Sequence, residues 1–153
     1  MLTLSTHLWY DTQAVEAAEF YASVFKDSKI KRKTQIEGTP SGKVDIVVMD
    51  ILGHEFQLIS AGPIFKFNES VSFIVTCDTQ EEIDYYWSKL SAVPESEQCG
   101  WLKDKFGLSW QIVPKVLGEL MNTDDKEKLS RVTQAFLQMK KFDIAALEAA
   151  AKE

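Results

Sequence analysis

The sequence predicts an α+β fold in which two similar modules, each of order β-α-β-β-β, are followed by helices. Short segments alternate between apolar and polar residues, as half-buried strands do, and apolar residues at helical spacing follow the first strand of each half. The same order of elements then starts again after residue 70. With 153 residues, 45% of them hydrophobic, the chain is large enough to form one domain with a substantial core.

The first module is predicted over residues 1–62. Residues 2–10 alternate as a strand, and the tripeptide DTQ at 11–13 opens a helical spacing of apolar side chains that continues to Phe25. Three further strands are predicted, at 28–37, 43–52 and 54–60. The last two are joined at Gly53, which indicates a tight turn.

The second module is predicted over residues 69–114. The segment VSFIVTC at 71–77 indicates a strand, DTQ at 78–80 a helix cap, and the helical spacing continues to Leu90. The remaining strands are predicted near 97–99, 101–106 and 108–113. Neither module has enough surface to bury a core alone, so we expect the two to pair.

Residues 115–153 are predicted to form a helical extension. A short helix is expected at 115–121, and Thr123 followed by two aspartates indicates the start of a second helix. Its apolar stripe consists of Leu129, Val132, Phe136 and Met139. Asp143 is expected to cap a last helix. A stripe of this kind is typical of packing against the domain or against a partner.

Charge and composition limit the classes of partner. The net charge is −6 and basic residues are scattered among acids, which disfavours nucleic acid. The cationic run at 26–33 is typical of a solvated strand edge. No apolar stretch approaches ~18 residues, and the N-terminus lacks the pattern of a signal peptide. We therefore expect a cytoplasmic protein without membrane contacts, whose Cys77 and Cys99 are reduced thiols.

The first and last strands of each module have one apolar and one mixed face. The apolar face, expected beneath the helices, carries Leu4, Thr6, Leu8, Phe56, Leu58, Val71, Phe73, Val75, Trp110 and Ile112. The opposite face carries Ser5, His7, Trp9, Gln57, Ile59, Ser72, Ile74, Thr76, Ser109, Gln111 and Val113. The second set is too polar to be a core face.

Three stretches of sequence carry a family resemblance: AVEAAEFYASVF, FKFN and CGWLKDKFGLSWQIVP. With the paired modules, they make the chain resemble the PhnB-like branch of the vicinal oxygen chelate superfamily, which includes glyoxalase I and bleomycin-resistance proteins. The resemblance implies curved mixed sheets, a ligand cavity on the mixed face, and a homodimer. Members of this branch often carry the label 3-demethylubiquinone-9 3-methyltransferase. The seven glycines form no glycine-rich strand-to-helix turn, which argues against a methyltransferase cofactor site.

The resemblance places the metal ligands of glyoxalase-type enzymes at His7, Gln57, Ser72 and Gln111. Only His7 is a good ligand for a transition metal, because amide and hydroxyl oxygens are weak neutral donors. We therefore expect no resident metal, with His7 as the one weak candidate. A shift of one strand would bring other residues to this face, but the alternation opposes such a slip.

Catalytic residues remain unassigned at this level. His7 has the chemistry of a general base, and Asp11, Asp45, Asp50 and Glu55 are all open as its partner. Neither cysteine has an assigned base, and Cys99 is expected to be the more exposed thiol.

A binding role requires less of these residues. Aromatic rings expected near the mixed face are Trp9, Phe65, Phe67 and Trp101, and neutral hydrogen-bonding groups are His7, Gln57, Asn68, Ser72 and Gln111. They suit a small polar or aromatic ligand. Two alternatives stay open: a metal-dependent lyase, isomerase or dioxygenase-like enzyme of glyoxalase type, and a structural or interaction module.

Overall fold

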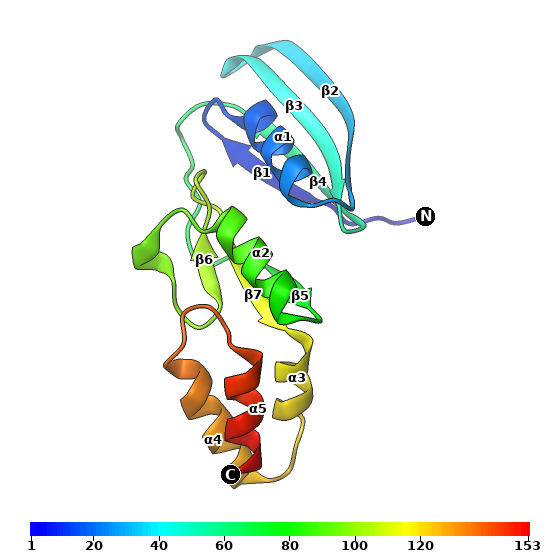
Figure 1. Cartoon of the computed structure of the whole chain (residues 1–153). Coiled ribbons are helices and arrows are strands. Elements are labelled where there is room, and N and C mark those ends of the chain that lie inside the picture. Colours follow the sequence, from blue (N-terminus) through cyan, green and yellow to red (C-terminus); the bar gives the residue numbers. More distant parts are fainter. The chain divides into compact units, whose positions relative to one another are not determined.

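The structure is a computed structural model that describes all 153 residues and divides into two compact units, Met1–Phe67 and Asn68–Glu153 (Figure 1). The first unit contains β1 (Thr6–Tyr10), α1 (Ala14–Val24), β2 (Ser28–Thr39), β3 (Gly42–Ile51) and β4 (His54–Ser60). The second contains β5 (Ser72–Cys77), α2 (Gln80–Leu90), a 3-10 turn η1 (Pro94–Ser96), β6 (Trp101–Lys103), β7 (Ser109–Pro114), α3 (Lys115–Met121), α4 (Lys126–Leu137) and α5 (Ile144–Lys152). The division lies between the two predicted modules, 1–62 and 69–114.

The first unit is a four-stranded sheet of order β1-β4-β3-β2 with α1 across one face (Figure 1). Strand β1 is parallel to β4, and the other pairs are antiparallel. The predicted turn at Gly53 is present: Leu52 and Gly53 both have positive φ, 50° and 82°, as in the hairpin turns that suit twisted strands. The buried side of α1 consists of Ala14, Ala17, Ala18, Tyr21 and Val24.

The second unit has a three-stranded sheet of order β5-β7-β6, covered by α2. The strand predicted at 97–99 is wrong: only Gln98 bridges to Trp101, and the two residues between them have positive φ and form a turn. Strand β6 is also shorter than expected, because the chain turns after Lys103.

The strand pattern predicts burial for two apolar residues that are exposed in the structure. Leu4 and Val71 were predicted on the apolar face, but they are 88% and 59% exposed. Pairing in the two sheets begins only at Thr6 and at Ser72, so both residues precede the first position that has a neighbouring strand. Without that neighbour, alternation does not lead to burial.

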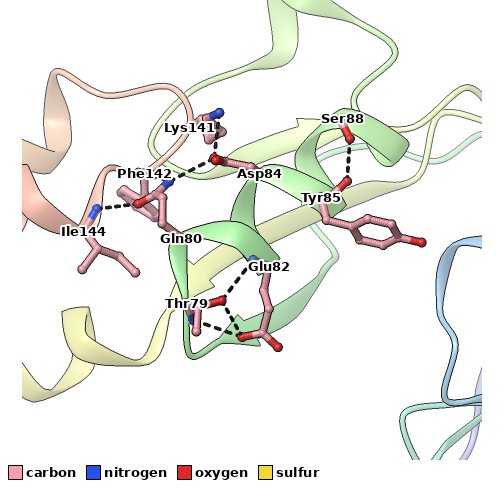
Figure 2. Close-up of polar contacts among 9 residues, drawn as sticks. All are labelled: Thr79, Gln80, Glu82, Asp84, Tyr85, Ser88, Lys141, Phe142 and Ile144. Atoms are coloured by element: carbon pink, nitrogen blue, oxygen red, sulfur yellow. Dashed lines mark hydrogen bonds and ion pairs between the residues drawn. The ribbon is translucent and has the colours of Figure 1, made fainter.

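The two DTQ tripeptides act differently. The second supplies Thr79, which forms a capping box with Glu82 at the start of α2 (Figure 2). The first provides no side-chain cap, and the N–H of Ala14 instead donates to Ser60 Oγ at 2.8 Å. The last residue of β4 therefore accepts a hydrogen bond from the first backbone N–H of α1, in place of a cap from the preceding residue.

A buried carboxylate organises the hairpin between β6 and β7. Asp104 is 1% exposed; its Oδ1 accepts the N–H groups of Phe106 and Leu108 at 2.9 and 3.1 Å, and its Oδ2 accepts the indole N–H of Trp110 at 2.9 Å. Gly107 closes the turn with φ 89°. A turn therefore joins the last two strands of the predicted second module, with the aspartate as its organiser.

The C-terminal extension forms the three predicted helices. Asp143 caps α5 through its carboxylate, as expected, whereas α4 is capped by the carboxylate of Asp125, two residues after the start indicated at Thr123. The helices bury Val132, Phe142 and Leu147, against which Val113, Leu117, Leu120, Met121, Phe136, Met139 and Ala151 pack. The predicted stripe on α4 is thus used mostly inside this unit. None of the helices has the length and apolar content needed to cross a membrane.

Gly100 allows the extension to approach the sheet. Its φ is 83°, and a Cβ placed on it would lie 2.3 Å from Phe142 Cε2 and 3.1 Å from the carbonyl oxygen of Ile112. Phe142 is itself buried in the helical core. A side chain at position 100 would therefore collide with a ring that has little room to move.

We predict that Gly100→Ala lowers the free energy of unfolding by about 3 kcal/mol, the sum of a left-handed backbone cost and of overpacking. Chemical denaturation measures this change. Gly38→Ala is the matched control, because Gly38 has φ 75° and nothing within 4 Å of an added Cβ. That control should lose only about 1 kcal/mol. Equal losses in the two variants would show that the contact with Phe142 has no energetic weight.

Candidate functional site

The face of the first sheet opposite α1 carries the predicted residues of β1 and β4. His7 pairs with Gln57 in the register of the two strands, and Phe56 and Leu58 are buried on the other face. On its other side, Gln57 pairs with Val48 of β3. His7 is exposed and Gln57 is half-buried, so the predicted alternation is confirmed here.

A charged cluster occupies the same face beside Gln57. Lys31 Nζ lies 3.1 Å from Glu55 Oε1 and 3.2 Å from Asp50 Oδ1, and the hydroxyl of Ser5 donates to Glu55. The hydrogen bond from Ser5, followed by those from Lys31 and Gln57, holds the pKa of the Glu55 carboxyl below its usual range. Glu55 is therefore an ionised, fully engaged carboxylate.

The observed register excludes the strand slip considered above. His54 lies on the opposite face of β4 from Gln57, with its Nε2 2.8 Å from Thr6 Oγ1. The carboxylates weighed as partners of His7 are mostly engaged elsewhere: Asp50 and Glu55 bind a lysine, and Asp45 accepts a hydrogen bond from Gln35 at 2.8 Å. The structure thus assigns no general-base pair to His7.

The predicted aromatic residues of the first unit hold its connecting segment. The indole N–H of Trp9 donates to the carbonyl of Gly62 at 2.8 Å, and its ring meets Phe65 edge-on at 5.0 Å. Phe67 packs in the same way on Tyr10, at 5.1 Å. Trp9 and Phe67 therefore have a structural role, because their contacts hold the segment after β4 against β1.

Asn68, at the start of the second unit, organises a local turn. Its Oδ1 accepts hydrogen bonds from the N–H of Ser70 at 2.9 Å and from the hydroxyl of the same serine at 2.6 Å. This arrangement is an Asx turn, so the acceptor oxygen of Asn68 is already used.

Gln111 faces the open side of the second sheet. It is half-buried, stands between Ile74 and Trp101 in the register, and donates from Nε2 to Ser72 Oγ at 2.9 Å. Gln111 and Ser72 are therefore brought together as predicted.

Beside β6 lies a shallow surface pocket of about 410 Å³, wide open to solvent, which we call the Trp101 cavity. It is lined by Glu69, Ser96, Gln98, Cys99 and Trp101. Of these, the sequence predicted only Trp101 as a ligand contact. Glu69 precedes β5, Ser96 ends the 3-10 turn η1, and Gln98 and Cys99 lie in the region wrongly predicted as a strand. At these positions strand alternation carries no information.

The polar groups of the cavity differ in their availability. Glu69 Oε1 is bound to Lys103 Nζ at 2.5 Å, and this bond lowers the pKa of Glu69 from its usual value. The indole N–H groups of Trp9 and Trp110 have partners within the chain, whereas the indole N–H of Trp101 has none. Trp101 thus offers a ring face and a free donor to a ligand.

The two thiols have different environments. Cys77 is buried at the end of β5, and desolvation, with a smaller effect of nearby carboxylates, raises its pKa to about 11. Cys99 is half-buried at the cavity wall, with its Sγ 3.8 Å from the carbonyl of Leu137. The expectation that Cys99 is the more exposed thiol is confirmed.

The residues at the four inherited metal-ligand positions do not fit a divalent ion. One imidazole, two amides and one hydroxyl leave the charge of a dication uncompensated, and Gln111 and Ser72 are bound to each other. Within either unit, no three histidine, cysteine or carboxylate side chains gather as an ion would require. We derive no chemical step through a metal.

The Ser5–Glu55–Lys31 cluster predicts a pH effect. A lowered carboxyl pKa in the folded state means that the cluster stabilises the fold above the usual carboxyl pKa and loses this effect as pH falls through the lowered value. Ser5→Ala and Lys31→Met should each raise the pKa of Glu55, measured by carboxyl-carbon NMR with Glu55→Gln for assignment. Lys43→Met, whose amine lies 3.9 Å from Glu37, is the control and should leave it unchanged. An unmoved pKa in both test variants would contradict the cluster.

Comparison with known proteins gives one family and a set of solved structures. The sequence profile of the 3-demethylubiquinone-9 3-methyltransferase family matches residues 3–113. The PhnB protein from Bacillus cereus, which carries the same description, is 30% identical over 74% of this chain and 99% of its own, with a TM-score of 0.61. Protein PA1353 from Pseudomonas aeruginosa is 14% identical over 74% and 98%, with a TM-score of 0.55. A comparison with curated proteins found no match.

A third solved structure is a mutant form of FosX, the fosfomycin resistance protein from Listeria monocytogenes, in complex with Mn(II) and 1S,2S-dihydroxypropylphosphonic acid. It is 13% identical over 74% of this chain and 92% of its own, with a TM-score of 0.54. At this identity the likeness concerns the fold alone. The family match ends at residue 113, so α3, α4 and α5 lie beyond it.

Proposed function

The chain belongs to the 3-demethylubiquinone-9 3-methyltransferase family, whose solved relatives have the vicinal oxygen chelate fold, and we propose that it binds a small polar or aromatic molecule without a metal. The observation that carries the proposal is the Trp101 cavity. Its volume of about 410 Å³ is in the range of small-molecule sites, about 300 to 1,000 Å³.

The chemistry of the cavity favours a neutral ligand with a planar ring. Trp101 provides a stacking face and a free N–H donor, and Ser96 and Gln98 add neutral polar groups at the wall. The charge of Glu69 is balanced by Lys103, so neither a strongly anionic nor a strongly cationic ligand gains a free counter-charge there.

A methyltransferase activity receives no support from the glycines. Six of the seven have positive φ, namely Gly38, Gly42, Gly53, Gly62, Gly100 and Gly107. Gly38 and Gly42 lie at the joined ends of β2 and β3, the other four lie between elements, none of the six lies at a strand-to-helix junction, and Gly118 lies within α3. The backbone therefore builds no glycine-rich phosphate-type loop at the start of a helix. The description of the family is therefore not a basis for assigning methyltransferase activity to this chain.

The alternative is a metal-dependent enzyme of glyoxalase type, with His7 as the first ligand. Its support is the fold shared with FosX, together with an exposed imidazole on the open face of β1. The resemblance also supports a cytoplasmic homodimer, whose mass light scattering would measure directly.

The binding proposal is tested with a library of neutral aromatic compounds screened by thermal shift, and hits are measured by calorimetry. Trp101→Ala should weaken the binding of a hit about ten-fold or more, because a stacked aromatic contact contributes about 1 kcal/mol in addition to the area it buries. Phe65→Ala is the control, since Phe65 is an exposed aromatic of the other unit. If Phe65→Ala weakens binding and Trp101→Ala does not, the ligand binds elsewhere.

The metal question is tested by rebuilding the donor set. The triple variant Gln57→Glu, Ser72→His and Gln111→Glu gives each unit one imidazole beside one carboxylate on neighbouring strands. The wild type should bind Ni²⁺ or Zn²⁺ weakly, and the variant should bind several kcal/mol more tightly because of its charge and better ligands. Titration calorimetry compares the two. Tight stoichiometric binding by the wild type that His7→Ala abolishes would favour the enzyme alternative.

A further inference from the structure

The segment Leu137–Phe142, which joins α4 to α5, lies against the wall of the Trp101 cavity, and we call it the strap. Three N–H groups of the wall donate to strap carbonyls: Cys99 to Met139 at 2.8 Å, Gly100 to Lys140 at 2.8 Å, and Gln98 Nε2 to Leu137 at 3.2 Å. Two of these residues, Gln98 and Cys99, line the cavity. The strap therefore forms the outer support of that wall.

The wall has a backbone conformation that requires such support. Cys99 has φ 49°, a left-handed conformation that is uncommon for a residue with a side chain, and Gly100 follows with φ 83°. Strained conformations of this kind persist where surrounding contacts hold them. The strap supplies two of those contacts at the two positive-φ residues themselves, and the carbonyl of Gly100 accepts a third hydrogen bond from Ile112 at 2.8 Å.

Gln80, in the first turn of α2, fixes the far end of the strap (Figure 2). Its Nε2 donates to the carbonyl of Phe142 at 2.9 Å, and its Oε1 accepts the N–H of Ile144 at 2.8 Å. One turn later, Asp84 Oδ1 binds Lys141 Nζ at 2.8 Å and accepts a second hydrogen bond from Gln80 at 3.1 Å. Helix α2 thus holds the strap through one amide and one ion pair.

The strap lies outside the part of the chain that matches the family, which ends at residue 113. We propose that the strap is a component of the ligand site in this chain, and that Gln80 is a positioning residue that keeps Gln98, Cys99 and Trp101 in their binding arrangement. The consequence for binding rests on the function proposed above. By linkage, a ligand that needs the ordered wall also stabilises the docked strap.

The two thiols allow the positioning role to be measured without a ligand. Cys99 belongs to the wall and becomes more accessible when the strap leaves, whereas Cys77 is buried under α2 with a pKa of about 11 and reacts only on wider unfolding. The rate of Cys99 labelling therefore reports local opening, and the rate of Cys77 labelling reports global opening.

The experiment measures labelling of the full chain by Ellman's reagent at pH 8, with Cys99→Ser identifying the faster thiol. Gln80→Leu should raise the Cys99 rate about ten-fold, as expected when two hydrogen bonds that resist opening are lost, and should leave the Cys77 rate slow. Gln134→Leu is the matched control, because Gln134 is an exposed glutamine of α4. It should change neither rate.

A second variant keeps the test decisive if Gln80→Leu folds poorly. Lys141→Met removes only the ion pair with Asp84 and should raise the Cys99 rate by a smaller factor, about two- to five-fold. An unchanged Cys99 rate in both variants, or rates of Cys77 and Cys99 that rise together, would overturn the positioning role.

The link to binding is tested with 1-aminoanthracene, a neutral planar fluorophore of the ligand class proposed above. Gln80→Leu should weaken its binding several-fold, and Trp101→Ala should weaken it further. If the Cys99 rate rises while neither substitution alters fluorophore binding, the strap positions the wall but the proposed binding function of the cavity fails. If Trp101→Ala weakens binding and Gln80→Leu changes neither the rate nor the affinity, the strap has no part in the site.

Discussion

The buried carboxylate of Asp104 is the interaction on which the second unit depends. Burying a charge is costly unless hydrogen bonds compensate it, and this carboxylate accepts three, from the N–H groups of Phe106 and Leu108 and from the indole of Trp110. The same bonds close the hairpin, set the register that places Trp101 beside Gln111, and orient Trp110 toward the core. The hairpin that carries Trp101 and Gln111 is therefore organised around one compensated charge.

Both open faces have polar groups that satisfy one another. In the first unit, Lys31 joins Glu55 and Asp50 next to Gln57, and in the second, Gln111 is bound to Ser72. Groups already compensated in this way have little to gain from a dication, because a metal would have to displace existing partners. They leave aromatic surface and a few neutral donors as the means of recognition, which is the basis of the binding proposal.

The helical extension lies beyond the part of the chain that matches the family, and it packs against the second sheet. It has its own buried core around Val132 and Leu147, yet it meets the sheet through Phe142 at Gly100 and through backbone hydrogen bonds at the cavity wall. Apolar packing holds the helices together, and the hydrogen bonds from Cys99 and Gly100 to the strap hold the wall of the Trp101 cavity against them. Stability and site geometry are thus joined at a few residues of α2 and the strap.

The sequence by itself determined the features that depend on near neighbours: the strand alternation that separates Leu58 from Gln57, the helix caps at Thr79 and Asp143, and the order of a strand, a helix and further strands in each half. The order of the strands and their two-residue alternation also predicted that His7 lies beside Gln57 and Ser72 beside Gln111. Only the tertiary structure decided the turn mistaken for a strand at 97–99, the exposure of Leu4 and the walls of the Trp101 cavity. The physical reason is that the left-handed turn at Cys99 is held by hydrogen bonds that its N–H groups donate to carbonyls far along the chain. Burial of an alternating residue likewise requires a neighbouring strand that no local pattern reveals.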